Sequence, residues 1–276
     1  MIAWLVQSFD NRPGMFQGVP PSGLLTKAEL SQLAGLKVDK RRREWLLGRW
    51  TAKWLVQAVV EAQTGRRVEM RDFRIRNTED GVPQVVWERS DRPGLSLQIS
   101  ISHSGSYALC ALQVGQANGL LGADIEPIEP RPAGFVDDYF VEAEANRLRM
   151  VEAGFPIDTL VTATWSAKEA ALKALQLGLS VDTRSVSCLI RPLAGLSTGW
   201  RTYMVVPDLH RIPKSLPYLC GWWRAMGDYI LTIVSANGQE PLSEKSLRRL
   251  FLTSALVYHS NPDRDTKSTV LSGGVL

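Results

Sequence analysis

The chain has 276 residues, of which 45% are hydrophobic and 22% charged, and a formal net charge of +4. These values are ordinary for a globular protein with a sizeable core. The mild positive charge suits an anionic ligand or an acidic protein partner, but it is too small to indicate nucleic-acid binding. No stretch approaches the roughly 20 apolar residues that span a bilayer. The first residues, MIAWLVQSFD, lack the pattern of a signal peptide, and Cys110, Cys188 and Cys220 lack zinc-type spacing. We therefore expect a cytoplasmic protein with reduced thiols and no membrane contact.

The first part of the chain predicts a strand, two helices and then several strands. Apolar residues in the second helix recur close to a 3.6-residue period, and this helix stops at Gly65. The later segments are short, rich in β-branched residues and separated by turn residues such as the EDG of positions 79–81. The predicted elements are a strand at 2–8, helices at 26–36 and 39–65, and strands at 68–76, 82–88, 97–104 and 106–114.

The same order of elements follows a second time. After a strand at 119–127, helices are predicted at 136–152 and from about 158 to 177. Strand patterns return at 186–192, 200–207, 218–225 and 228–236. Strand, helices and strands occurring twice indicate an α+β protein, with the change-over near 113–119. We find no sequence repeat between the halves, only this repeated order. The expected division is an N-terminal lobe at 1–118, a C-terminal lobe at 119–240, and a partly flexible C-terminal extension at 241–276.

Three carboxylates crowd the end of the predicted strand at 119–127. In LLGADIEPIE, Asp124, Glu126 and Glu129 fall within six residues. Alternate side chains of a strand share a face, so Asp124 and Glu126 should project together, about 7 Å apart along the strand. Two such carboxylates are a common half-site for Mg²⁺, which takes further ligands from water and phosphate. A solvated strand end is the alternative interpretation.

A second segment, TWSAKEAALKAL at 164–175, is predicted to be helical. Ser166 and Glu169 have the spacing of a capping box, which gives Glu169 a structural interpretation. Glu169 and Lys173 are four residues apart and share a helix face. Together with Lys168, this helix offers one metal ligand and two cations to a phosphate, although Glu–Lys pairs at this spacing are usually surface decoration.

A third segment, SISHSGSYALCAL at 100–112, joins two predicted strands through a polar turn. His103 is one of three histidines in the chain, and Ser102, Ser104 and Gly105 flank it. A serine hydrolase would need a nucleophile turn such as G-x-S-x-G, which the chain lacks. Hydroxyls, imidazole and backbone N–H groups fit a phosphate-binding turn better. The alternative is a structural histidine in a hairpin.

Basic residues also cluster where the second predicted helix begins. Two acids, Asp39 and Glu44, lie in the same stretch. This stretch is either a solvated helix face or an anion-binding surface that makes charge-assisted hydrogen bonds to phosphate. No RNP-type aromatic pattern or helix-turn-helix signature accompanies it, so nucleic acid is not favoured. The basic residues are Lys37, Lys40, Arg41, Arg42, Arg43, Arg49 and Lys53.

In this order, four segments resemble the Sfp-type 4′-phosphopantetheinyl transferases. They read RREWLLGRWTAK, SISHSG, GADIE and WSAKEAALK. The specific part is the last pair, with 45 residues from Asp124 to Glu169. The likeness extends from the first strand to about residue 238. It implies two pseudo-twofold-related α+β lobes with the site in the cleft between them, and the C-terminal extension lies outside it.

The resemblance implies a Mg²⁺-dependent transfer of the phosphopantetheine arm of coenzyme A to a serine of an apo carrier protein, with release of 3′,5′-ADP. Asp124, Glu126 and Glu169 would hold Mg²⁺ against the pyrophosphate, with Glu169 also counted among the catalytic residues. Glu144, in YFVEAEANRL, would deprotonate the carrier serine or orient a water that does so. Lys173 would contact the phosphate that is transferred. Such a cation arrangement neutralises charge that would otherwise repel the attacking oxygen.

The family likewise implies where coenzyme A binds. Ser102 and His103 would meet its 3′-phosphate side, and the basic stretch would face the adenosine phosphates. Many members have Gly-Lys-Pro in the loop before the SISHSG motif, whereas this chain has Gly81-Val82-Pro83 and so lacks one cation. The expected coenzyme A contacts are Lys37, Lys40, Arg42, Arg43, Lys53, Gly81, Pro83, Ser102, His103, Lys168 and Lys173, and which of the five in the basic stretch make contact stays open.

The expected protein partner is an acidic acyl or peptidyl carrier, because complementary charge speeds encounter with a basic enzyme. Carriers of the fatty acid, polyketide, nonribosomal peptide and lysine pathways all fit. The stretch AGFVDDYF after Pro132 is a docking candidate, and two lobes in one chain predict a monomer. Two alternatives are a Mg²⁺-dependent coenzyme A pyrophosphate hydrolase and a non-catalytic protein that binds coenzyme A or a carrier.

Overall fold

The structure of the chain, a computed structural model, describes residues 1–10, 13–115, 119–150, 156–177, 181–190, 199–212, 216–236 and 238–253. Within these ranges the α+β class is confirmed by ten strands and seven α-helices. None of the helices in these ranges combines the length and the hydrophobicity that crossing a membrane requires.

The first lobe is a three-stranded antiparallel sheet of order β1-β5-β4, beside which lies the β2–β3 hairpin. The long helix α3 packs on β1 and β5, and it ends at Gly65, whose φ of 68° is the left-handed conformation that glycine adopts readily. The elements are β1 (Ile2–Ser8), α1 (Pro13–Phe16), α2 (Lys27–Gly35), α3 (Asp39–Thr64), the 3₁₀ turn η1 (Met70–Asp72), β2 (Phe73–Asn77), β3 (Pro83–Trp87), β4 (Leu97–Ser104) and β5 (Tyr107–Val114).

The second lobe is a five-stranded antiparallel sheet of order β6-β10-β9-β8-β7. Helix α6 packs on β6 and β10. The elements are β6 (Leu121–Pro127), α4 (Phe135–Tyr139), α5 (Glu142–Arg149), α6 (Ile157–Ala174), the 3₁₀ turn η3 (Thr183–Ser185), β7 (Val186–Leu189), β8 (Arg201–Pro207), β9 (Cys220–Met226) and β10 (Tyr229–Ser235).

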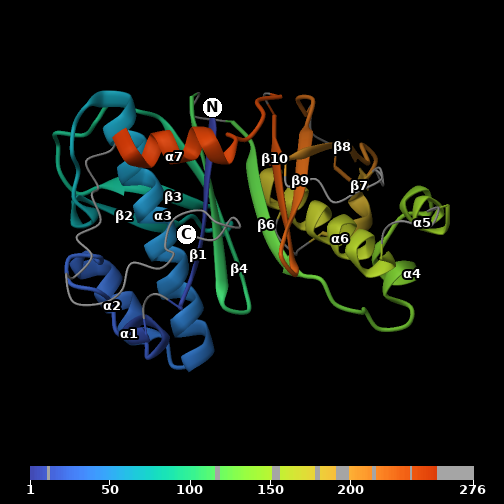
Figure 1. Cartoon of the computed structure of the whole chain (residues 1–276), viewed down its shortest axis with the longest axis horizontal. Coiled ribbons are helices and arrows are strands. Elements are labelled where there is room, and N and C mark those ends of the chain that lie inside the picture. The colour runs from blue at the N-terminus through green and yellow to red at the C-terminus, as the bar shows by residue number, and fades with distance from the viewer. Residues whose placement is uncertain are drawn as a thin grey trace.

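The two sheets lie between the two long helices. Figure 1 shows α3 outside the first sheet and α6 outside the second, with β4 and β6 adjacent at the lobe junction. Apolar residues from both sheets form one cluster with α3, among them Leu109, Ile125 and Ile233, all 0% exposed. The junction is therefore a core interface, and residues that reach it from β4 and β6 are held in fixed relative positions.

The lobes repeat one another element by element. Each runs strand, short helices, long helix, 3₁₀ turn and four strands, and the order β1-β5-β4 beside the hairpin matches β6-β10-β9-β8-β7. One short sequence match accompanies the repeated order of elements. Residues 50–53 of α3 read W-T-A-K, and residues 165–168 of α6 read W-S-A-K.

The structure differs from the expectations in three places. The predicted helix at 136–152 is two helices, α4 and α5, with the extended residue Phe140 between them. Helix α6 begins at Ile157, so Ser166 and Glu169 are mid-helix and the capping box expected there is absent. Pro13–Phe16, which lie outside every predicted element, form α1.

The C-terminal extension contains a helix that docks on both lobes. Helix α7 (Glu244–Thr253) lies across α3 (Figure 1) and buries Leu247. Glu244 pairs with Arg224 of β9 at 2.6 Å. Trp4 Nε1 of β1 donates to the carbonyl of Leu242 at 2.8 Å. Residues 241–253 are thus part of the folded body, whereas 254–276 lie outside the described residues.

Gly122 in the GADIE segment is required by the close packing of β6 on α6. A Cβ at this position would lie 1.9 Å from the carbonyl oxygen of Ala170. We expect Gly122→Ala to lower the free energy of unfolding by roughly 1–3 kcal/mol or more, because the helix must move away from the strand. Gly35→Ala, where a Cβ meets nothing within 4 Å, is the matched control. Urea melts compare the two, and equal stability of both variants would contradict the packing argument.

Candidate active site

Asp124 lies at the centre of the lobe junction and has partners from three elements. It projects from β6 and is 3% exposed. Ser102 Oγ of β4 donates to its Oδ1 at 2.7 Å. Lys173 Nζ of α6 donates to the same oxygen at 2.7 Å and to Ser102 Oγ at 3.0 Å. A carboxylate, a hydroxyl and an ammonium group from both lobes therefore meet at one point.

Two further carboxylates lie close to Asp124. Glu126 shares its strand face, and Glu169 lies one turn before Lys173 on α6. Burial raises the pKa of Glu169 to about 7, and the negative charge of Asp124 adds to the rise. Burial likewise raises the pKa of Glu126, again with a contribution from Asp124. The three acids thus repel one another in a poorly solvated place, which favours uptake of a cation.

Two of the carboxylate oxygens in this cluster have no hydrogen-bond partner. Asp124 Oδ2 and Glu169 Oε1 are both buried and unpaired. Buried carboxylate oxygens are rarely left so, and each is a hard ligand of the kind that Mg²⁺ prefers. Arg131 Nη2 lies 3.0 Å from Glu126 Oε2. With Lys173 on Asp124 and Arg131 on Glu126, no three His, Cys, Asp or Glu side chains within the described ranges are already grouped at metal-ligand spacing. The two unpaired carboxylate oxygens are of the ligand type that a divalent cation takes.

The raised pKa of Glu169 predicts a pH dependence of stability. Between pH 4.5, the ordinary value for glutamate, and about 7, the folded carboxyl keeps a proton that the unfolded one loses. Raising the pH through this window should therefore lower the free energy of unfolding when no divalent cation is present. Glu169→Gln should remove this part of the slope, while Glu240→Gln at an exposed position should not. Melts in EDTA from pH 4.5 to 8 measure it, and identical slopes for wild type and Glu169→Gln would contradict the assignment.

His103 lies beside this cluster on β4. Its side chain is 45% exposed, and Nδ1 lies 3.9 Å from Glu44 of α3. Burial lowers the pKa of His103, Glu44 opposes this effect, and the positive charge of Lys173 lowers the pKa further. Glu44 in turn pairs with Lys40 at 3.7 Å. The SHSG turn and the start of the basic helix therefore adjoin the acids, as an extended anion-binding surface would require.

The basic stretch is divided between the surface and the interior. Lys37 and Lys40 are exposed. Arg42 is partly buried and donates to the carbonyls of Gly18 and Leu33, and the Arg43 guanidinium lies over the Phe16 ring. Lys53 is 0% exposed and pairs with Glu29. The expected contact between Lys53 and coenzyme A is therefore wrong, because no surface of its ammonium group is accessible.

Two more expected roles are corrected by burial. Lys168 is 0% exposed and pairs with Glu144 at 2.8 Å, so it cannot contact coenzyme A. Glu144 is also enclosed, and Cys188 N donates to its Oε1 at 2.6 Å. A base for an incoming serine needs an accessible oxygen, which Glu144 lacks here. Ser102 Oγ donates to Asp124, so its hydroxyl supports the acid, and its expected role toward the 3′-phosphate side of coenzyme A stays a prediction.

Gly81 lies in the turn between β2 and β3, and Pro83 is the first residue of β3. Gly81 has a φ of 81°, and the amide of Val82 receives support from Thr78 Oγ1, which accepts its hydrogen at 3.1 Å. A role of this turn toward coenzyme A stays a prediction.

Sequence reasoning missed two polar residues at the junction. Arg131, beyond two prolines after Glu126, binds both Glu126 and Glu129. Ser100 Oγ accepts from Ala123 N at 2.9 Å and so fixes β6 on β4 beside Asp124. Ser100 could have been predicted, because it alternates with Ser102 along one strand and so shares its face. Nothing in the neighbouring sequence indicated the direction of Arg131.

The second lobe is similar to known proteins. The model of the 4′-phosphopantetheinyl transferase superfamily matches residues 120–234. The holo-[acyl-carrier-protein] synthase of Staphylococcus carnosus (strain TM300) is 30% identical over 88 residues, covering 32% of this chain and 71% of that protein. The enzyme of the same name from Bacillus subtilis (strain 168) is 31% identical over 85 residues, covering 31% of this chain and 68% of that protein.

A solved structure of similar name is more distant. A holo-(acyl-carrier-protein) synthase from Bacillus anthracis str. Ames in complex with CoA (3′,5′-ADP) is 23% identical, covering 41% of this chain and 93% of that one, with a TM-score of 0.33. At that score the likeness carries no argument. The two sequence relatives do support an assignment, because the match covers more than two thirds of each at 30% identity or more. The chain therefore belongs to the 4′-phosphopantetheinyl transferase superfamily.

Proposed function

We propose that this chain is a two-lobed, Sfp-type phosphopantetheinyl transferase that moves the 4′-phosphopantetheine arm of coenzyme A onto a serine of an apo carrier protein. One observation carries the proposal. Asp124, Glu126 and Glu169 gather with Lys173 at the lobe junction, and two of the carboxylate oxygens are buried without partners. Such a site suits the pyrophosphate of coenzyme A together with a divalent cation.

The acids would hold Mg²⁺, with Asp124 and Glu126 contributed by β6 and Glu169 by α6. When bound, the ion supplies Lewis acidity and neutralises the pyrophosphate. Lys173, which is 30% exposed and pairs with Asp124 here, would bind the transferred phosphate. Arg131 similarly pairs with Glu126. The side-chain cations thus keep the acids together until the substrate arrives.

The reaction is a direct displacement at phosphorus. The carrier serine oxygen forms a bond to the phosphorus that bears the pantetheine, and the bond from that phosphorus to the bridging oxygen breaks. The leaving group is 3′,5′-ADP, and the serine proton passes to water. Lys173 stabilises charge on the transferred phosphate, and no covalent enzyme intermediate is needed. Burial of Asp124 and Ser102 at the junction holds these groups in place before the substrate binds.

His103 and the basic residues at 37–43 would bind the 3′-phosphate, the one phosphate of coenzyme A outside the pyrophosphate. Lys37, Lys40 and Arg41 are exposed there, and Arg43 is partly exposed beside Phe16. A lowered pKa leaves His103 neutral near pH 7, and a bound phosphate dianion would raise that pKa and recruit a proton. Val82 replaces a cation near the nucleotide, so more of the affinity would come from α3.

The partner would be an acidic carrier, attracted by the net charge of +4. We propose that the chain acts as a monomer, because both lobes of the site belong to one polypeptide, and that it binds no nucleic acid. The three cysteines are free, with Cys110 and Cys188 buried, which agrees with the reducing cytoplasm.

Intact-mass spectrometry tests the function. Apo carriers of the fatty acid, polyketide, nonribosomal peptide and lysine pathways are incubated with the protein, coenzyme A and Mg²⁺. We expect one carrier to gain one phosphopantetheine mass on a single serine, with loss of the gain in EDTA. Cleavage of coenzyme A at the same rate without a carrier would instead indicate a pyrophosphate hydrolase. Binding without mass gain or cleavage would indicate a non-catalytic protein.

A further inference from the structure

Among the described residues, each lobe contains one lysine whose ammonium group is wholly buried. Lys53 ends the W-T-A-K of α3, and Lys168 ends the W-S-A-K of α6. Both are 0% exposed. A buried ammonium group is costly unless it is paired and hydrogen-bonded. Two such groups at equivalent positions of the two lobes therefore indicate a recurring structural element of the fold.

Both lysines pair with a glutamate 24 residues earlier in the chain. Lys53 Nζ donates to Glu29 Oε2 at 2.5 Å, and Lys168 Nζ donates to Glu144 Oε2 at 2.8 Å. Each glutamate occupies the third position of a short helix, α2 or α5, and accepts from the backbone N–H that begins it. These distances are 3.0 Å from Thr26 N and 2.9 Å from Val141 N.

Both pairs also attach to the strand after the long helix. Lys53 donates to the carbonyl of Phe73 at 2.8 Å, and Ile75 N donates to Glu29 Oε1 at 3.0 Å. In the second lobe, Lys168 donates to the carbonyl of Val186 at 2.6 Å, and Cys188 N donates to Glu144 Oε1 at 2.6 Å. The carbonyl and the N–H belong to the first and third residues of β2 and of β7.

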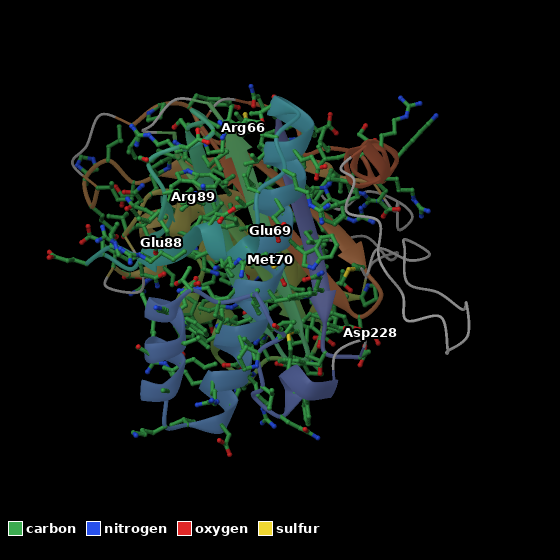
Figure 2. All side chains as sticks on the ribbon, turned by 90° about the vertical axis from the view of Figure 1, so that its left-hand side faces the viewer. Arg66, Glu69, Met70, Glu88, Arg89 and Asp228 are labelled. Atoms are coloured by element: carbon green, nitrogen blue, oxygen red, sulfur yellow. The ribbon has the colours of Figure 1, made fainter. Side chains whose placement is uncertain are left out.

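The networks differ in small respects. Lys53 also donates to the carbonyl of Met70 at 2.9 Å, and Figure 2 shows Met70 with Glu69 on the outer face of the first lobe. Arg49 Nε lies 4.0 Å from Glu29. These additions do not alter the shared contacts, which join one short helix, one long helix and one strand in each lobe.

The first lobe has the lysine–glutamate pair but lacks the residues equivalent to Glu169 and Lys173. Trp54 and Ala58 follow Lys53 at the positions that Glu169 and Lys173 occupy after Lys168. Helix α3 therefore has no carboxylate at the position after Lys53 that corresponds to Glu169. The pair of Lys53 with Glu29 of α2 is nevertheless complete. A contact that forms equally in a lobe without the acids is explained by the fold and not by catalysis.

From this repetition we infer that Glu144 and Lys168 are positioning residues, and that neither touches coenzyme A or the carrier serine. The pair fixes the rotation of α6 against α5 and β7. Glu169, adjacent to Lys168, and Lys173, one turn further on, are thereby directed at Asp124. This inference rests on the proposed transferase function for its catalytic part, whereas the equivalence of the two pairs does not depend on it.

Four variants test the inference. Glu144→Gln and Glu29→Gln each leave a buried lysine without its counterion. Both should lower the melting temperature by a similar amount, roughly 5–15 °C, because an unpaired buried charge is strongly destabilising. Glu144→Gln/Lys168→Met and Glu29→Gln/Lys53→Met remove the charge with the pair, and methionine retains the apolar stem. Both double variants should regain most of the lost melting temperature.

Catalysis separates positioning from proton transfer. For Glu144→Gln/Lys168→Met we expect kcat within about tenfold of wild type, because a positioned base alone contributes roughly 10²–10⁴-fold. The pH profile of kcat should keep its ascending limb. The inference is overturned if Glu144→Gln keeps the wild-type melting temperature but loses kcat by 10²-fold or more, the double variant fails to recover it, and the limb disappears.

Failure to fold also decides the matter. If both double variants fail to fold, both pairs belong to the framework of the fold, as inferred; if only the Glu144 variants fail, the equivalence is wrong. Absence of transfer by the wild-type protein would overturn the proposed function instead. The melting comparison, which needs no substrate, would still test the two pairs.

Discussion

Asp124→Ala should reduce phosphopantetheine transfer by at least roughly 10³-fold. Asp124 is the buried acid at which Ser102, Lys173 and the two other carboxylates meet. Its removal deprives the cation of a ligand and frees Lys173, and metal assistance contributes several kcal/mol at about 1.4 kcal/mol for each factor of ten. Initial rates of carrier modification at saturating coenzyme A and Mg²⁺ measure the effect.

Glu129→Ala is the matched control for that experiment. Glu129 follows Asp124 by five residues, its side chain is 56% exposed, and it contacts only Arg131 among the described ion pairs. We expect near wild-type transfer from this variant. A rate for Asp124→Ala within tenfold of that control, with the fold intact by circular dichroism, would contradict the placement of the site.

Lys173→Ala should lower kcat by roughly 10²–10³-fold, the range for losing one preorganised charge at a developing anion. Lys173 Nζ is 2.7 Å from Asp124 and 3.0 Å from Ser102, and it is a partly exposed cation that adjoins the acids from α6. The Mg²⁺ requirement should persist, because the acids remain. Steady-state kinetics with varied Mg²⁺ separate the two effects.

Lys245→Ala removes an exposed lysine from α7 and controls for net charge. It should leave kcat unchanged. Should Lys173→Ala affect only the KM for the carrier and spare kcat, Lys173 would belong to carrier recognition and not to the reacting phosphate.

Local sequence patterns predicted the bounds of some strands correctly, because polar or turn residues clearly mark where those strands end. The strands at 2–8 and 97–104 have the expected bounds, since apolar runs there end at polar or turn residues. The same reasoning misplaced the start of α6. Ser166 and Glu169 have capping-box spacing, but Thr159, Thr162 and Ala163 before them are buried within the helix, and tertiary packing overrides the local signal.

The acids of the site were also predictable from periodicity. Strand alternation places Asp124 with Glu126, and helix spacing places Glu169 with Lys173. Burial of the lysines was not predictable in this way, because Lys53 and Lys168 are paired with glutamates 24 residues distant. The W-T-A-K and W-S-A-K segments were the one available signal, and it is short enough to pass unnoticed without the repeated topology.

The cross-lobe bond between Ser102 and Asp124 depends on packing alone. Both residues lie on strands whose faces could be predicted, but nothing in either strand says that β4 lies against β6. Arg131 is similar, since its contact with Glu126 depends on the path of the chain through Pro127 and Pro130. Long-range contacts of this kind define the site more closely than any motif.

Anomalous diffraction from crystals grown with Mn²⁺ and coenzyme A tests the central claim most directly. The account predicts one manganese peak beside carboxylate oxygens of Asp124, Glu126 and Glu169 and beside the pyrophosphate, with Lys173 Nζ at the phosphate. Coenzyme A bound at the lobe junction with no manganese at these acids, or with the pyrophosphate away from Lys173, would contradict it.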